Sequence, residues 1–131
     1  MADFKKLEVW RKSHALALVA HRVALTIRGG QYASLRNQII RASMSIPANI
    51  VEGREQTSER EFARFLRYAL GSTSELEYHL IAARDIEVVG AEDFIALVSQ
   101  LKEVRMMLFG LLRRLGTSDQ QHASMKKAQS Q

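Results

Sequence analysis

The stretch AEDFIALVSQLKEVRMMLFGLLRRLG, residues 91–116, carries the clearest structural pattern in the chain. Its apolar residues recur at alternating steps of three and four positions, and these are Phe94, Leu97, Leu101, Val104, Leu108, Leu111 and Leu115. This heptad spacing is typical of a helix that packs in a bundle or a coiled coil. We therefore predict a helix over residues 91–115 that ends at Gly116.

Three earlier segments also show helical periodicity, and no segment shows the sustained alternation of a β-strand. We predict helices over residues 7–28, 32–52 and 58–88, because glycines that favour a helix end follow each of them. Ser58 and Glu61 form the sequence signature of a capping box at the start of the third helix. Since such short loops force consecutive helices to run antiparallel, the fold class is all-α, as an antiparallel up-down-up-down four-helix bundle.

The chain length of 131 residues, 47% of them hydrophobic, fits one globular domain with a real core. We place this four-helix bundle domain in residues 1–116. Residues 117–131 are polar and aperiodic, so we predict that they form a flexible tail.

Composition narrows the cellular setting and the class of partner. The sequence has no cysteine, which excludes disulfide bonds, thiolate metal ligands and a thiol nucleophile. No apolar run approaches the roughly 20 residues of a membrane-spanning helix, and the first residues do not resemble a secretory signal. We therefore expect a cytoplasmic protein without a membrane partner. The net charge of +5 favours nucleic acid or another polyanion as a partner.

The candidate catalytic and metal-binding groups lack the spacing that known chemistry requires. A di-metal bundle needs paired Glu-x-x-His motifs, whereas Glu75 and His79 are four residues apart and have no counterpart. His14 and His21 share a helix face but supply only two ligands, too few for zinc. RNA-cleaving bundles of the HEPN type carry an arginine four to six residues before a histidine, and this chain has no such pair. We therefore predict a protein that is not an enzyme and uses no metal or cofactor.

Two predicted helices carry more apolar residues than one bundle face requires. In residues 7–28, one stripe consists of Val9, Leu16, Ala20, Val23 and Ile27, and a second, interleaved with His14 and His21, consists of Trp10, Ala17, Leu18 and Leu25. In residues 32–52, the two groups are Leu35, Ile39, Ala42, Ile46 and Ile50, and then Ile40, Met44, Pro47 and Val51. A peripheral helix needs one apolar stripe, so the second groups predict self-association; the alternative is that they belong to the core.

Three arginines of the third predicted helix, Arg60, Arg64 and Arg67, share one edge. Like charges at this spacing repel each other by a few tenths of a kcal/mol, so the stripe needs an explanation. One explanation is contact with phosphate, for which the arginine fork is well suited. The other is an ordinary solvated face on which Glu61 and nearby acids relieve the repulsion.

Polar residues form a strip beside the core stripe of the second and third predicted helices. Its members, which we call the polar seam, are Gln38, Arg41, Ser45, Asn49, Glu52, Ser72 and Glu75. Antiparallel pairing through the loop brings Arg41 opposite Glu75, so we predict an ion pair there, joined by Ser72 or Gln38. If the pair is buried, removing one partner costs about 3–5 kcal/mol. The alternative is that the strip faces a subunit interface or RNA.

The polar seam also carries a family resemblance. The string from Gln38 to Gly53 contains Arg41-Ala, Ser45-Ile-Pro-Ala-Asn49-Ile and Glu52-Gly53, and it is followed by Glu61-Phe62…Phe65-Leu66 and Gly71-Ser72…Glu75-Leu-Glu77. Together with Leu7-Glu8-Val9-Trp10, these motifs resemble the four-helix-bundle family of 23S rRNA intervening-sequence proteins over residues 4–115. The chain departs from the family at residues 28–31, where Arg-Gly-Gly-Gln stands in place of the usual proline and acidic residue.

The resemblance implies a ring-like homo-oligomer, a pentamer, that associates with structured RNA or with a reverse transcriptase, as in accessory proteins of diversity-generating retroelements. Combined with the charge, it predicts a homo-oligomeric nucleic-acid-binding or ribonucleoprotein accessory protein for structured RNA or DNA. The alternative is a protein–protein scaffold whose basic charge is incidental.

Overall fold

The structure, a computed structural model, describes the backbone of residues 3–129 and the side chains of residues 3–116. Within this part it contains α1 (Glu8–Leu25), α2 (Ala33–Arg54), α3 (Glu59–Asp85) and α4 (Ala91–Gln129). Two short 3-10 helices, η1 (Phe4–Lys6) and η2 (Gly30–Tyr32), precede α1 and α2. No described residue belongs to a β-strand, so the all-α prediction is confirmed.

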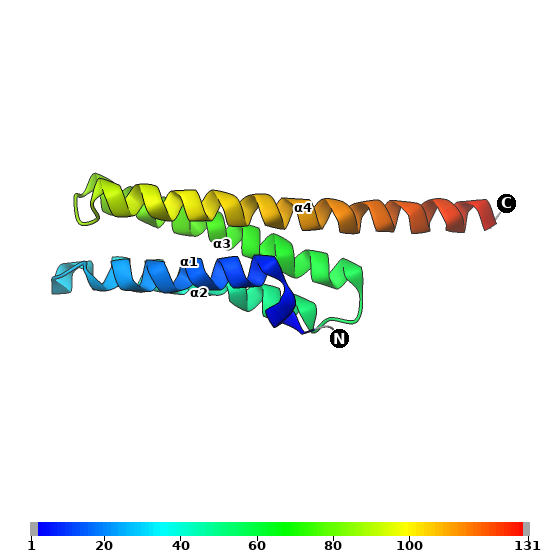
Figure 1. Ribbon diagram of the computed structural model, residues 1–131, viewed down its shortest axis with the longest axis horizontal. Helices are drawn as coiled ribbons and strands as arrows, with labels where there is room; N and C mark the ends of the chain where they lie inside the picture. Colours follow the sequence, from blue (N-terminus) through cyan, green and yellow to red (C-terminus); the bar gives the residue numbers. More distant parts are fainter. Residues whose placement is uncertain (1–2, 130–131) are drawn as a thin grey trace.

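The four helices lie side by side along one long axis (Figure 1). Helix α2 packs against α1 and α3, and α4 packs against α3 and α1, so each helix contacts two others. The amino terminus, the α2–α3 connection and residues 110–116 lie at one end of the bundle, whereas the α1–α2 and α3–α4 connections lie at the other. Within the part of the chain that the structure describes, no helix is both long and apolar enough to cross a membrane.

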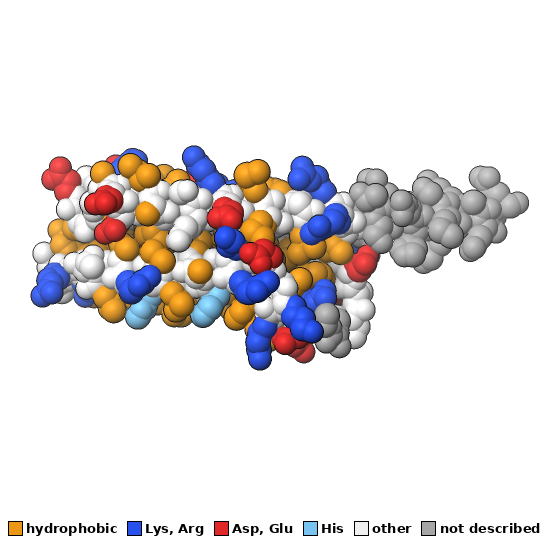
Figure 2. Space-filling view, in the orientation of Figure 1, with side chains coloured by type: hydrophobic (Ala, Val, Ile, Leu, Met, Phe, Trp, Pro, Cys, Tyr) orange, Lys and Arg blue, Asp and Glu red, His pale blue; other side chains and the backbone are white. Residues whose placement is uncertain are grey.

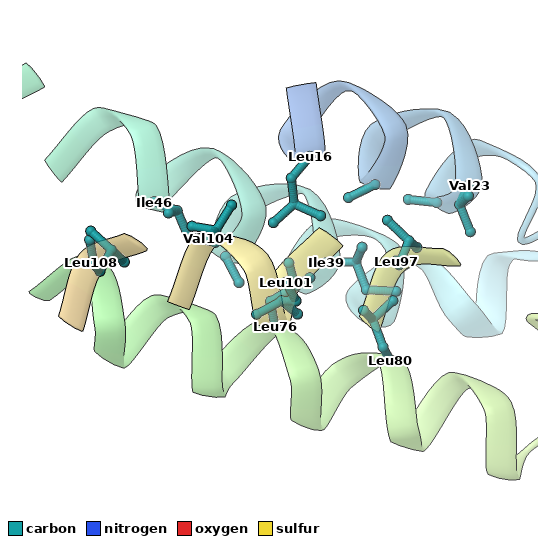
Figure 3. Packing of buried hydrophobic residues seen from close by; sticks show 14 of the residues in the cluster. Leu16, Val23, Ile39, Ile46, Leu76, Leu80, Leu97, Leu101, Val104 and Leu108 are labelled. Carbon is teal, nitrogen blue, oxygen red and sulfur yellow. The ribbon is translucent and has the colours of Figure 1, made fainter. Parts of the chain in front are cut away.

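The apolar seam of α4 forms one side of the core (Figure 3). Leu97, Leu101, Val104 and Leu108 are at most 1% exposed, while Phe94, Leu111 and Leu115 are partly buried against them. They face fully buried residues of the other helices, among them Leu16, Ile39, Ile46, Leu76 and Leu80. Each such side chain contributes about 1.5–3 kcal/mol of burial free energy, which explains why the heptad spacing determines the packing.

Helix α2 continues past the glycine at which its end was predicted. Gly53 lies inside the helix and is buried, and a Cβ atom there would come within 2.8 Å of Phe65 Cβ and 2.9 Å of Phe62 Cδ1. The predicted end at Glu52 was therefore wrong by two residues. Glycine stands at this position because the backbone of α2 approaches the side chains of α3 closely.

The ends of α1 and α3 depend on other local features. Helix α1 ends at Leu25, three residues before the predicted end, and Gly29 adopts φ 109°, a conformation that favours glycine. Ser58 caps α3 as predicted, because its Oγ accepts a hydrogen bond from the Glu61 backbone N–H at 3.1 Å. The reciprocal half of the capping box is not formed, since the Glu61 carboxylate binds Arg64. Helix α3 ends at Asp85, and Glu87 takes the positive φ expected of glycine.

Helix α4 runs through Gly116 to Gln129, so its predicted end at Leu115 was wrong. Glycine costs a helix interior only about 1 kcal/mol, which a long helix tolerates. The division into a bundle of residues 1–116 and a flexible tail of residues 117–131 stays a prediction, because the described side chains end at Gly116 and residues 130–131 lie outside the described residues.

Candidate nucleic-acid interface

Positive charge is concentrated at one end of the bundle. Residues 3–12, 52–67 and 110–116 meet at this end, which we call the basic end, and they carry ten Lys or Arg and six Asp or Glu. Residues 22–36 and 84–93, at the opposite end, carry four of each kind. Figure 2 shows Lys and Arg side chains grouped around the basic end. The bundle therefore carries a positive potential at one end, where polyanions are attracted.

The predicted arginine stripe belongs to this end. Arg60, Arg64 and Arg67 are all exposed on the first turns of α3. Within residues 3–116, the guanidinium groups of Arg60 and Arg67 form no ion pair or hydrogen bond, so their donors are free to bind phosphate.

Arg64 is held more tightly than its two neighbours. Its guanidinium contacts the Glu61 carboxylate at 2.7 Å and donates a hydrogen bond to the Tyr68 hydroxyl at 3.1 Å. It also lies 5.2 Å from the centroid of the Phe65 ring. The hydrogen bond to Glu61 and the attraction of that carboxylate raise the pKa of Arg64 above its ordinary value. Glu61 thus relieves repulsion at Arg64, as the solvated-face interpretation expects.

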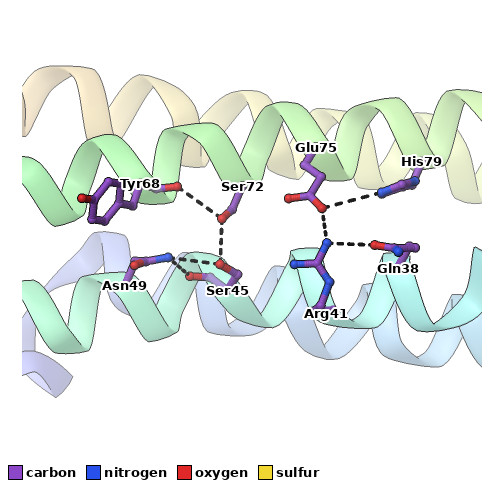
Figure 4. Close-up of polar contacts among 8 residues, drawn as sticks. All are labelled: Gln38, Arg41, Ser45, Asn49, Tyr68, Ser72, Glu75 and His79. Atoms are coloured by element: carbon purple, nitrogen blue, oxygen red, sulfur yellow. Dashed lines mark hydrogen bonds and ion pairs between the residues drawn. The ribbon is translucent and has the colours of Figure 1, made fainter.

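The polar seam lies between α2 and α3 and forms two separate links (Figure 4). In the first, Arg41 and Glu75 form the predicted ion pair, and Gln38 Oε1 accepts a hydrogen bond from Arg41 at 2.8 Å. The Arg41 and Glu75 side chains are 59% and 38% exposed, so the energy of a buried pair does not apply. His79 Nε2 lies 3.9 Å from the same Glu75 oxygen.

The second link joins hydroxyl groups. Ser45 Oγ and Ser72 Oγ are 2.7 Å apart, and Asn49 Nδ2 donates to the Ser45 backbone oxygen at 2.8 Å. Ser72 therefore pairs with Ser45 and does not join the Arg41–Glu75 pair. Glu52 is exposed, and within residues 3–116 its carboxylate makes no hydrogen bond or ion pair. The polar seam thus joins α2 to α3 through the Arg41–Glu75 and Ser45–Ser72 contacts, whereas Gln38 and Asn49 bond to partners on α2 itself.

The second apolar groups of α1 and α2 divide between core and surface. Ala17 and Pro47 are buried, and Trp10 and Ile40 are partly buried against the core, so these members contribute to packing, while Val51 is half-buried. Leu18, Leu25 and Met44 are 48%, 60% and 45% exposed. Figure 2 shows hydrophobic and histidine side chains along the edge where α1 lies. Further exposed apolar residues on α4, not predicted as such, are Ile95, Met106 and Phe109.

A polar contact between α3 and α4 was missed by sequence reasoning. Arg105 of α4 donates a hydrogen bond to Thr73 Oγ1 at 3.2 Å, and its guanidinium lies 3.6 Å from the Glu77 carboxylate. The only available signal was a charged residue next to the buried Val104. Among the described residues, no group of three or more His, Asp or Glu is placed to hold a metal ion.

A family model matches a range of residues that includes the α2–α3 link and the whole of α1. The model for the 23S rRNA-intervening sequence protein covers residues 5–110, most of the chain. The chain belongs to this family. A similar solved structure, a protein of unknown function from the S23 ribosomal protein family of Bacteroides thetaiotaomicron, has a TM-score of 0.74 and 26% sequence identity. The alignment covers 79% of this chain and 97% of that one. Comparison with curated proteins finds no match.

Membership of this family confirms the resemblance seen in the sequence, and the structure shows what the residues of the polar seam contact. The family motif from Arg41 to Gly53 supplies, in this chain, both the polar contacts to α3 and the buried glycine that lets α3 approach. The arginine stripe of α3 lies close in sequence to this motif but points to solvent.

Proposed function

We propose that the protein is a cytoplasmic, non-enzymatic, homo-oligomeric bundle that binds nucleic acid as a ribonucleoprotein accessory protein. The observation that carries the proposal is the basic end, where cations outnumber acids by four and where Arg60 and Arg67 have no acidic partner within residues 3–116. Arginine binds phosphate oxygens through paired donors, and several such contacts add without reading the base sequence.

Structured RNA is the first nucleic acid to test, because the family is named for an intervening sequence of 23S rRNA. A reverse-transcriptase-type protein is the protein partner we propose. The exposed apolar residues of α1, α2 and α4 support self-association, with a ring of five subunits as the proposed form; they are Leu18, Leu25, Met44, Met106 and Phe109.

We also infer an antiparallel up-down-up-down order of the helices. The short connections support it, as do the contacts of Gly53 with Phe62, of Ser45 with Ser72 and of Arg41 with Glu75, in which rising numbers on α2 meet falling numbers on α3.

The alternative function is a protein–protein scaffold with incidental basic charge. The exposed apolar residues of α1, α2 and α4 favour it, because patches of this kind mark protein interaction sites. The scaffold hypothesis predicts an affinity for RNA no higher than that of any protein with the same net charge.

A charge-matched pair of variants separates the two functions. Replacing Arg60, Arg64 and Arg67 with Gln removes three cations from the basic end, whereas replacing Arg22, Arg28 and Lys102 with Gln removes three exposed cations elsewhere. We expect the first variant to bind a structured RNA about tenfold or more weakly than the wild type in a gel-shift titration. The second should keep most of its affinity. Equal affinity of both variants would favour the scaffold.

A further inference from the structure

The amino-terminal segment gathers three aromatic rings at the basic end. Phe4 of η1 meets Trp10 of α1 edge-on, with ring centroids 5.1 Å apart and planes at 70°. Trp10 and His14 lie nearly parallel, with centroids 5.1 Å apart and planes at 6°. Trp10 is partly buried against the core, whereas His14 is exposed. One face of the His14 ring therefore covers Trp10, and the other is turned away from it.

One basic side chain lies beside the first of these rings, and a second follows it in the sequence. Lys5 Nζ lies 6.0 Å from the centroid of the Phe4 ring, and Lys6 is the next residue. Within residues 3–116, neither lysine forms an ion pair through its ammonium group. Arg11 is paired with Glu8 at 2.9 Å, so the unpaired charge of this segment lies on Lys5 and Lys6.

Packing of the core explains the position of Trp10 and of Phe4, which covers part of Trp10. It does not explain why the exposed imidazole of His14 lies parallel to the indole. Alternating aromatic rings and cations are the arrangement with which proteins hold single-stranded nucleic acid, since bases stack on rings while cations follow the phosphates. A two-fold contact with a second copy is a poorer fit at this point, because it would bring Lys5 and Lys6 close to the same positive charges; in a ring this segment would face a different surface of the neighbouring subunit.

We propose that the Phe4–Trp10–His14 stack is a base-stacking site for unpaired nucleotides. A base lies on the open face of His14, and Lys5 and Lys6 hold the adjoining phosphates. This inference rests on the proposed function and narrows its ligand to nucleic acid with single-stranded loops, bulges or ends, where bases are free to stack.

Two strands of equal charge test the site. A 12-nucleotide RNA and an abasic strand of the same length present the same phosphates, but only the first has bases. We expect the wild-type protein to prefer the base-bearing strand about tenfold, because stacking one base is worth roughly that factor. Trp10 is the only tryptophan of the sequence, so its emission should change with the RNA and not with the abasic strand.

Two single variants on one helix complete the test. His14→Ala should lose about tenfold in affinity for the RNA and keep its affinity for the abasic strand. His21→Ala, one heptad further along α1 and without a described hydrogen bond or ring contact, should behave as the wild type. Alanine favours the helix at both positions, so both variants should fold.

Several results would overturn the site. If the wild-type protein bound the two strands with equal affinity, base stacking would be refuted. Binding through the phosphates, and with it the proposed function, would still stand. Loss of binding in His14→Ala for both strands alike, or a change of molar mass in that variant, would assign His14 to folding or to a subunit contact. Absence of binding to either strand would also overturn the site, whereas the proposed function would be contradicted only if the structured RNA of the gel-shift titration failed to bind as well.

Discussion

At Gly53 the backbone of α2 lies against two phenylalanines of α3, and no side chain fits between them. An added Cβ would meet Phe65 Cβ at 2.8 Å, and this atom sits next to the α3 backbone and cannot swing away. We expect Gly53→Ala to lower the free energy of unfolding by about 1–3 kcal/mol, the usual cost of overpacking. Urea denaturation followed by circular dichroism measures this change.

Gly71 is the matched control for this substitution. It lies in the interior of α3, and beyond the adjoining backbone of its own helix nothing lies within 4 Å of the position that a Cβ atom would take. Gly71→Ala should therefore raise the free energy of unfolding, by up to about 1 kcal/mol, through helix propensity alone. Changes of the same sign in the two variants would contradict this account of both glycines.

The two glycines also show what a sequence conceals at the residue scale. Glycine after an apolar run is the usual mark of a helix end, and Gly53 carries that mark although its helix continues to Arg54. The close approach that requires it depends on Phe62 and Phe65, which belong to another helix. The Arg41–Glu75 pair, by contrast, was predictable because a short loop sets the pairing of α2 and α3.

At the scale of the elements, the contact between α2 and α3 includes one exposed ion pair. Because Arg41 and Glu75 are 59% and 38% exposed, water screens their attraction, and we expect a coupling free energy of about 0.5–1 kcal/mol. A double-mutant cycle of Arg41→Ala and Glu75→Ala measures it by urea denaturation. The pair of Lys12 with Glu103, equally exposed at the α1–α4 contact, should give a similar or smaller value. Strictly additive Arg41 and Glu75 effects would refute the coupling.

The helices themselves were largely predictable because each has a local cause. The heptad spacing of residues 94–115 marks the buried face of α4, and Ser58 marks the start of α3. The ends were less predictable. Helix α3 stops with Glu87 in a positive-φ conformation that sequence rules reserve for glycine, and α4 passes through Gly116 because nothing in the backbone stops it there.

At the scale of the whole molecule, exposed apolar residues predict assembly. Light scattering behind a sizing column at micromolar concentration should give a mass several times 14.8 kDa. Leu18→Gln with Leu25→Gln should reduce that mass, because both side chains are about half exposed and their apolar surface would be covered in an oligomer. Ile86→Gln, an equally exposed residue at the far end of α3, serves as the control. A monomer of the wild type would disprove self-association.

The basic end could not be predicted from the sequence, although its arginine stripe could. Its charges come from residues 3–12, 52–67 and 110–116, which are far apart along the chain and meet only in the folded bundle. The Phe4–Trp10–His14 stack was missed for a related reason, since the turn of η1 brings Phe4 back onto α1. The net charge indicates a basic protein, whereas the concentration of that charge at one end of the bundle depends on how the helices are connected.

The salt dependence of RNA affinity tests the central claim, that phosphate contacts at the basic end bind nucleic acid. Each lost contact lowers the slope of log K against log salt by about one unit. Compared with the wild type, the variant with Gln at Arg60, Arg64 and Arg67 should therefore show a slope up to about three units shallower. The variant with Gln at Arg22, Arg28 and Lys102 should retain nearly the full slope. Identical slopes for all three proteins would contradict the claim.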